Sequence, residues 1–176
     1  MAGARVLHVV VCAAGPAGDV GTLVARAQAE GWTVCVIATP SARAFVDVAA
    51  LEALTGYPVR SEHRAPDTES PLPAPDALAV APATFNTINK SAAGVSDTLA
   101  LSHLNEAIGL GIPVVAMPFV NAALARHPAF ARSVEQLRQS GVMVVFAPGE
   151  PHPAGGGDPF AGSFPWHLAL AALRRA

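Results

Sequence analysis

The sequence predicts an α/β fold, a three-layer sandwich in which a parallel sheet of five to six strands lies between two layers of helices. Short, nearly continuous apolar runs recur along the chain, as expected for strands that are buried on both faces. Segments whose apolar residues repeat at helical spacing separate these runs. With 176 residues the chain is long enough for a full core, and residues 1–176 are expected to form one domain.

The first two strands are expected at Val6–Val11 and Thr33–Ala38, which are rich in β-branched and apolar residues. The helix between them has one apolar face, formed by Val20, Leu23, Val24 and Ala27. Asp19 is the expected N-cap of this helix, and Gly31 is its expected stop. The small residues at 12–18 suit the approach of backbone N–H groups to an anion, but their glycines match neither a dinucleotide fingerprint nor a P-loop.

Thr39 and Ser41 place hydroxyl groups where the second strand gives way to a helix, and Ser41 is the expected cap. Contact with a ligand at this edge of the sheet is the alternative role for both hydroxyls. Phe45 is expected in the core, with contact to a planar ligand as its alternative. A further strand beginning at Val59 and an exposed loop or mobile flap at 61–75 complete the first half.

The stretch 75–97 concentrates polar side chains around one turn. A buried strand is expected at 77–81, with Pro82 ending it. The turn that follows carries hydroxyl and amide groups, on Thr84, Asn86, Thr87 and Asn89. Such groups cap helices, and they also meet ligands at the carboxyl edge of an open sheet. We expect a ligand contact here, with Lys90 as either a surface charge or a site cation and Asp97 as either a helix-start acid or a cofactor contact.

The second half continues the alternation of strands and helices. The expected elements are a helix with Leu101, Leu104 and Ile108 on one face that stops at Gly109 or Gly111, a strand at 113–117, a helix from Pro128 to Gly141, a strand at 142–146 and a helix at about 164–174. A Gly/Pro-rich segment at 147–162, either a flexible lid or a disordered connection, precedes the last helix. Asn121 follows a strand, so polar groups come after four strands and predict a ligand site at their common edge.

Composition argues against several classes of partner. A net charge of -2 gives no electrostatic basis for binding nucleic acid. No window has the roughly 18 to 20 apolar residues of a membrane-spanning helix, and no secretion signal is recognisable, so a cytoplasmic protein is expected. The apolar share of 52% and charged share of 14% favour burial of surface between subunits. Cys12 and Cys35 are expected to be buried free thiols, and the scattered histidines predict no metal site.

The segment 81–90 reads Ala-Pro-Ala-Thr-Phe-Asn-Thr-Ile-Asn-Lys and is followed by Gly-Val-Ser-Asp at 94–97. It resembles the Pro-Ala-Ser-Ala-Asn-Thr signature of the flavoprotein family of homo-oligomeric flavin-containing cysteine decarboxylases. That family includes phosphopantothenoylcysteine decarboxylase and the peptidyl-cysteine decarboxylases of lantibiotic maturation. The resemblance covers roughly residues 6–145. It implies a Rossmann-like, flavodoxin-type subunit that binds FMN non-covalently, in trimers or dodecamers with the flavin near a subunit interface.

The resemblance also assigns roles by position. Cofactor-binding roles fall on Gly15, Pro16, Ala17, Thr39, Ser41, Phe45, Ala83, Thr84, Asn86 and Asp97. Phe45 would lie beside the isoalloxazine ring, and Ala83, Thr84 and Asn86 would contact flavin or substrate. Asn86 and Asn121 are the expected catalytic residues, because a neutral amide donates a hydrogen bond to a substrate carboxylate without forming a buried ion pair.

The chain departs from the family pattern at its catalytic groups. The family carries a catalytic His eight residues before the Asp that matches Asp76, and that position is Thr68 here, with His63 five residues further upstream. A second family signature, Pro-x-Met-Asn-x-x-Met-Trp, holds the substrate. Residues 118–125 align with it; they keep the Asn as Asn121 but replace both Met and the Trp. In the family's coenzyme A biosynthesis enzymes a cysteine that contacts substrate follows the last strand, and Gly-rich sequence stands in its place here. These departures support FMN binding better than cysteine decarboxylation and predict a different or smaller ligand.

Three functions remain open. The first is an FMN-dependent, decarboxylase-like oxidoreductase that acts on a small-molecule or peptidyl carboxylate. The second is a flavin prenyltransferase-like enzyme, although the Gly-Ala-Ser-Gly loop of that family is replaced by Cys-Ala-Ala-Gly at 12–15. The third is a flavin-binding or regulatory subunit without catalysis, which Thr68 at the position of the family His favours.

Overall fold

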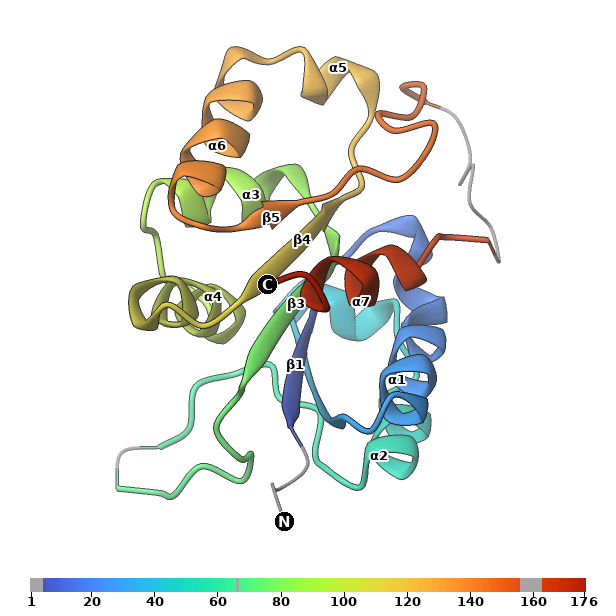
Figure 1. Cartoon of the computed structure of the whole chain (residues 1–176), viewed down its shortest axis with the longest axis vertical. Coiled ribbons are helices and arrows are strands. Elements are labelled where there is room, and N and C mark those ends of the chain that lie inside the picture. Colours follow the sequence, from blue (N-terminus) through green and yellow to red (C-terminus); the bar gives the residue numbers. More distant parts are fainter. Residues whose placement is uncertain (1–4, 66, 156–162) are drawn as a thin grey trace.

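The computed structural model describes residues 5–65, 67–155 and 163–176. Within these residues, five parallel strands form one sheet in the order β2-β1-β3-β4-β5. The strands are β1 (Val6–Val11), β2 (Thr33–Ala38), β3 (Ala77–Ala83), β4 (Val114–Pro118) and β5 (Met143–Val144). The connecting elements are η1 (Gly15–Asp19), α1 (Val20–Ala29), η2 (Pro40–Ala44), α2 (Val48–Thr55), α3 (Phe85–Ala92), α4 (Leu99–Leu110), α5 (Ala122–Ala125), α6 (Pro128–Gln139) and α7 (His167–Leu173). The predicted three-layer α/β sandwich is confirmed (Figure 1).

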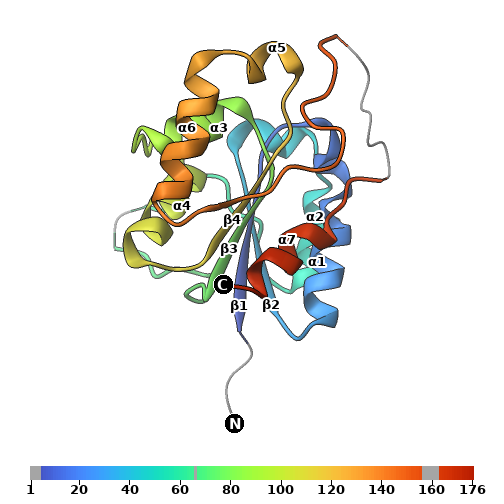
Figure 2. The same cartoon turned by 45° about the horizontal axis from the view of Figure 1, so that its top comes forward.

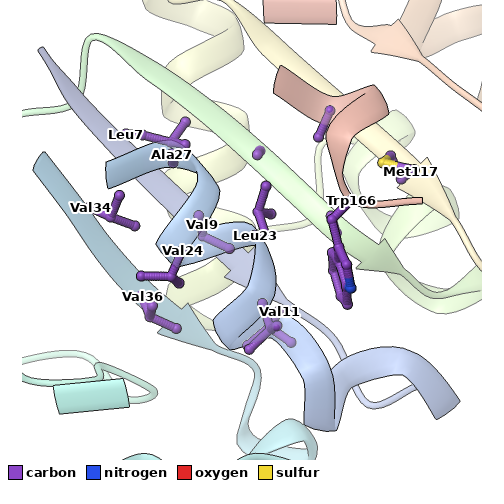
Figure 3. Packing of buried hydrophobic residues seen from close by; sticks show 14 of the residues in the cluster. Leu7, Val9, Val11, Leu23, Val24, Ala27, Val34, Val36, Met117 and Trp166 are labelled. Atoms are coloured by element: carbon purple, nitrogen blue, oxygen red, sulfur yellow. The ribbon is translucent and has the colours of Figure 1, made fainter. Parts of the chain in front are cut away.

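Side chains that alternate along the strands divide the core into two halves. On one face Leu7, Val9 and Val11 pack with α1, α2 and α7, as Figure 3 shows for α1 and for Trp166 before α7. On the other face Val10 and neighbouring strand residues pack with α3, α4 and α6. The two groups of helices lie on opposite sides of the sheet in Figures 1 and 2. Burial on both faces explains why these strands read as nearly unbroken apolar runs.

Three strand predictions were wrong. The strand expected at 142–146 is shorter, Met143–Val144. No strand begins at Val59; Arg60 forms only an isolated bridge with Ile37 at the edge of the sheet, and the chain then enters the 61–75 loop. Pro82 does not end its strand, which continues to Ala83 through a register shift against β4. Proline lacks an N–H, but its carbonyl still accepts a hydrogen bond at 3.2 Å from the backbone N–H of Cys12, so pairing with the β1 side persists.

The helix boundaries depend on caps that the sequence only partly revealed. Asp19 makes no capping hydrogen bond, because α1 grows directly out of the 3-10 turn η1 and the residue lacks the extended backbone of a usual cap. Thr39, and not Ser41, caps η2 by accepting a hydrogen bond from the N–H of Ala42. Gly31 follows α1 with a φ of 86°, the left-handed conformation that makes glycine the preferred helix stop.

His8 is a histidine buried inside a β-strand, with 2% of its surface exposed. Its Nε2–H donates to the carbonyl of Pro73 at 2.9 Å, which ties the 61–75 loop to the sheet, and its ring meets the ring of His103 edge-on. Burial lowers the pKa of His8 to about 4, an effect that the Pro73 hydrogen bond opposes and that His103 reinforces. The folded chain therefore holds this imidazole neutral at pH 7.

We expect His8 to make the fold sensitive to acid. Between pH 6.5 and 4 the unfolded chain binds a proton at His8 that the folded chain does not bind, so stability is fully present above 6.5 and falls as the pH drops toward 4. The difference in pKa corresponds to a stability change on the order of 3 kcal/mol. Urea denaturation of His8→Phe across this range should give a shallower pH dependence than wild type. An equal slope would contradict the assignment, and His167→Gln, which alters an exposed histidine, is the control.

In the described part of the chain, no helix combines the length and the apolar character needed to cross a bilayer. The longest helices there, α4 and α6, have 12 residues each.

Candidate functional site

Two adjoining cavities lie over the carboxyl ends of the strands. The first, here called the hydroxyl cavity, has a volume of about 440 Å³ and is lined by Ala13, Thr39, Pro40, Ser41, Thr84, Asn86, Thr87, Lys90, Thr98 and Leu101. The second, the amide cavity, has about 340 Å³ and is lined by Ala13, Ala14, Thr84, Phe85, Asn86, Phe119, Val120, Asn121, Leu124 and His152. Because Ala13, Thr84 and Asn86 line both, the two cavities form one continuous site at the edge where such folds bind ligands.

Helix capping determines which atoms of the hydroxyl cavity remain for a ligand. Thr39 and Thr84 follow β2 and β3 directly, and each oxygen accepts a hydrogen bond from the first turn of the next helix. Thr98 does the same at the start of α4. A hydroxyl that accepts at a cap keeps a hydrogen that it can donate. Capping and ligand binding, posed as alternatives by the sequence, are therefore compatible for Thr39 and Thr98, whereas the Thr84 hydroxyl already donates its hydrogen to Thr87.

Cys12 is buried and belongs to a small hydrogen-bonded cluster with two threonines that line this cavity. Its thiol donates to the Thr87 hydroxyl at 3.3 Å, and the Thr84 hydroxyl donates to the same oxygen at 3.1 Å. Burial raises the pKa of the Cys12 thiol, and hydrogen bonds to threonine only partly offset that rise. Cys12 is thus a neutral, structural thiol, and because Thr87 accepts from both neighbours it keeps its own hydroxyl hydrogen for another partner.

Lys90 supplies the positive charge of the hydroxyl cavity. It lies in the last turn of α3, and its ammonium group pairs with the Asp97 carboxylate at 2.5 Å. The Lys90 side chain is 33% exposed and that of Asp97 50%, so the pair contributes little to stability. Asp97 does not line either cavity and acts on the site through Lys90, while Thr98, one residue later, caps the following helix.

The amide cavity combines two side-chain amides with aromatic surface. Asn121 follows β4, and its Oδ1 accepts from the N–H of Leu124, which leaves the Nδ2 hydrogens as donors. Asn86 is exposed on the first turn of α3 and lines both cavities. Phe85 and Phe119 provide apolar walls. The cavity therefore offers neutral hydrogen-bond donors beside flat apolar surfaces.

The remaining sequence-predicted site residues lie outside both cavities. Gly15, Pro16 and Ala17 form the turn η1 behind the Ala13–Ala14 rim, and Ala83 is buried at the end of β3. Phe45 is 48% exposed, so the expectation that it belongs to the core was wrong. The 3-10 turn η2 buries Ala42 and leaves Phe45, its C-cap, facing outward next to the cavity residues Pro40 and Ser41.

Two groups of residues in the site were missed from the sequence. The first group is the pair of alanines after β1: Ala13 lines both cavities and Ala14 lines the amide cavity, whereas Gly15 lines neither. His152 reaches the amide cavity from the Gly/Pro-rich segment, where no periodic pattern could indicate its partners; residues 156–162 of that segment lie outside the described residues. A backbone bridge between Asn121 and His152 brings this segment beside the end of β4.

Thr68 and His63 belong to neither of these cavities. Thr68 is exposed, and its hydroxyl donates to the carbonyl of Ala65 at 2.7 Å. His63 lines a separate cavity of about 530 Å³ between the 61–75 loop and α4. Across the described ranges, no group of three or more His, Cys, Asp or Glu side chains is arranged to hold a metal ion.

The chain is thus a doubly wound α/β protein with two adjoining cavities at the carboxyl edge of its sheet, the place where such folds bind ligands. Residues 3–162 match the sequence model of the family described as Flavoprotein. The chain belongs to the flavoprotein family, as its resemblance to the family signature predicted.

Relatives and solved structures agree with this assignment. The chain is 33% identical over 133 residues to the coenzyme A biosynthesis bifunctional protein CoaBC of Mycobacterium tuberculosis, and the match covers 70% of this chain but 30% of that protein. The crystal structure of the FMN-dependent cysteine decarboxylase SpaF is similar with a TM-score of 0.71 and 27% identity, covering 97% of this chain and 96% of the other. The FMN binding protein AtHal3 shares the fold, with a TM-score of 0.72, 18% identity and coverage of 98% and 96%.

Proposed function

We propose that the chain binds FMN across the two adjoining cavities and acts as an FMN-dependent, decarboxylase-like oxidoreductase on a small or peptidyl carboxylate. The observation that carries this proposal is the continuity of a hydroxyl-lined cavity with an aromatic, amide-lined one. Family membership and the similarity to SpaF, which is described as an FMN-dependent cysteine decarboxylase, support the same reading.

The donor set fits the chemical groups of FMN. A phosphate and a ribityl chain require hydroxyl donors and a cation. The hydroxyl cavity provides them through Lys90 and the hydroxyls of Thr39, Ser41, Thr87 and Thr98. An isoalloxazine ring requires apolar walls with a few hydrogen-bond donors, and the amide cavity provides Phe119 and Asn86. No carboxylate side chain lines either cavity among the described residues, so an anionic ligand meets no direct repulsion.

The protein's share of the chemistry is binding and orientation. Bound FMN would supply the two-electron oxidation that the side chains themselves cannot perform. Asn86 and the Nδ2 group of Asn121 would hold the substrate carboxylate, since both amides face the amide cavity and are neutral. Phe85, Phe119 and Leu124 would exclude water from the reacting groups.

A homo-oligomer forms part of this proposal. Phe45, at the end of the η2 turn that carries the cavity residues Pro40 and Ser41, is 48% exposed, and Leu124 is 40% exposed at the amide cavity. Large apolar side chains at the rim of a polar site favour coverage by another subunit. A second copy of this chain would thus complete the walls of both cavities.

The proposal is tested with the purified chain. FMN should bind and give the visible spectrum of a flavoprotein, and peptides ending in cysteine should lose carbon dioxide and two hydrogens, as detected by mass spectrometry. A protein fraction that stays colourless after incubation with FMN and removal of the unbound flavin would overturn the proposal. If the protein binds flavin but changes neither peptides that end in cysteine nor small carboxylates that carry a thiol, it is instead a flavin-binding subunit without catalysis. Thr68 supports this alternative, because it replaces the family's catalytic His and its hydroxyl donates to the carbonyl of Ala65.

We expect Lys90 to recognise the phosphate end of FMN. Replacing it with methionine, which keeps the apolar stem and removes the charge, should weaken FMN binding about tenfold, the scale of one hydrogen bond to a charged group. Riboflavin, which lacks the phosphate, should bind wild type and Lys90→Met equally well. Fluorescence titration with both flavins measures this difference. The control is Asp97→Asn, which keeps Lys90 in the cavity and should bind FMN at least as tightly as wild type.

A further inference from the structure

The amide cavity contains a titratable side chain that the sequence patterns did not single out. Among the described residues that line it, His152 alone has an ionisable side chain. Its ring packs in a tilted arrangement against Phe119, with the ring centroids 4.5 Å apart and the planes inclined by 31°. It therefore lies in the same cavity as the two proposed anchors, Asn86 and Asn121.

The main chain fixes the position of His152. Its N–H donates to the carbonyl of Val120 at 3.2 Å, and its carbonyl accepts from the N–H of Ala122 at 2.7 Å. These two bonds form a parallel bridge with Asn121, directly after β4. The histidine is thus held on both sides of its Cα, as a residue on a strand would be.

The tautomer of His152 follows from its neighbour. Nδ1 lies 3.1 Å from the carbonyl oxygen of Pro153. A carbonyl can only accept, so Nδ1 carries the hydrogen of the neutral ring and Nε2 carries the lone pair. The nearby ionisable groups are Glu150, whose carboxylate accepts from the N–H of Val120, and His127, which contacts the far wall residue Phe85.

We propose that His152 is the base that accepts the thiol proton of a cysteine-type substrate in the amide cavity. The S–H bond breaks, its electron pair stays on sulfur, and a new N–H bond forms at Nε2. The thiolate would then be the form of the substrate presented to bound flavin, the oxidant named in the proposed function. This inference rests on the proposed function, and it assigns to His152 a proton-accepting task that Thr68, at the position of the family's catalytic His, cannot perform.

The kinetic test compares wild type with His152→Gln, using FMN-loaded protein and a peptide ending in cysteine. We expect kcat to fall about 100-fold at pH 7, on the scale of general base catalysis, with KM changed less than about threefold. A free thiol ionises near pH 8.5, so the rate of the variant should rise with pH and approach that of wild type in alkaline solution. Loss of packing would not be restored by alkali. His167→Gln, at the start of α7, is the matched control and should behave as wild type.

A second readout does not require flavin. Nitrogen NMR of the chain without FMN should show His152 protonated at Nδ1 and unprotonated at Nε2 in its neutral form. The opposite tautomer, or an active wild type matched by His152→Gln at every pH, would overturn the role of His152 and leave the proposed function standing. A wild type that binds FMN but oxidises no thiol would overturn both.

Discussion

Replacing Ala13 with leucine should abolish FMN binding while the chain stays folded. Ala13 is half-buried at the end of β1 and lines both the hydroxyl cavity and the amide cavity. The three added carbons would occupy the place where the two cavities join, so a ligand that spans them would lose contacts and meet a steric clash. We expect an affinity loss on the order of 100-fold or more, about 3 kcal/mol, measured by fluorescence titration of FMN.

Ala13→Ser is the control for this substitution, since it adds one small polar atom and should retain FMN binding. Thermal denaturation of both variants without flavin should give midpoints close to that of wild type, because the site of change lies at a cavity rim. If Ala13→Leu binds FMN as tightly as wild type, the flavin does not span the two cavities.

The largest effect on stability is expected for Leu78→Ala. Leu78 lies in β3, the middle strand of the sheet, paired with His8 on one side and Val114 on the other, and it is fully buried. Removing its three terminal carbons leaves a cavity between packed layers, which costs about 2 to 5 kcal/mol in comparable cores. Urea denaturation at pH 7 gives the free energy of unfolding directly.

The matched control is Leu110→Ala, which makes the same chemical change at a leucine that is 68% exposed. This variant should change the free energy of unfolding by less than about 0.5 kcal/mol. Equal losses in the two variants would contradict the assignment of the core. A folded Leu78→Ala variant should also bind FMN more weakly, because the same strand leads directly into Thr84, which lines the site.

The sequence was sufficient for the layers of the fold and for the edge at which the site lies. Strands buried on both faces leave continuous apolar runs, and such runs located β1 and β2 to the residue. The polar turn after β3 identified Thr84 and Asn86, which line both cavities. These features depend on local residue patterns, which a single sequence records.

Features that depend on tertiary contacts could not be predicted. Phe45 has the composition of a core residue, and only the direction of the η2 turn places its ring outside. His152 enters the site through backbone bonds to β4, which are independent of its side chain and leave no mark in the sequence. A proline in a sequence predicts the end of a strand, but the carbonyl of Pro82 accepts a hydrogen bond from the N–H of Cys12 and so continues the pairing with the β1 side.

The bridge between Asn121 and His152 has a consequence for how this pocket diverges among proteins of the same fold. The two segments that form this wall are joined by N–H and C=O groups, which every residue except proline provides. Replacement of either side chain leaves that scaffold in place. The side chains that face the amide cavity can therefore change by point substitution at these positions, with the rest of the architecture retained.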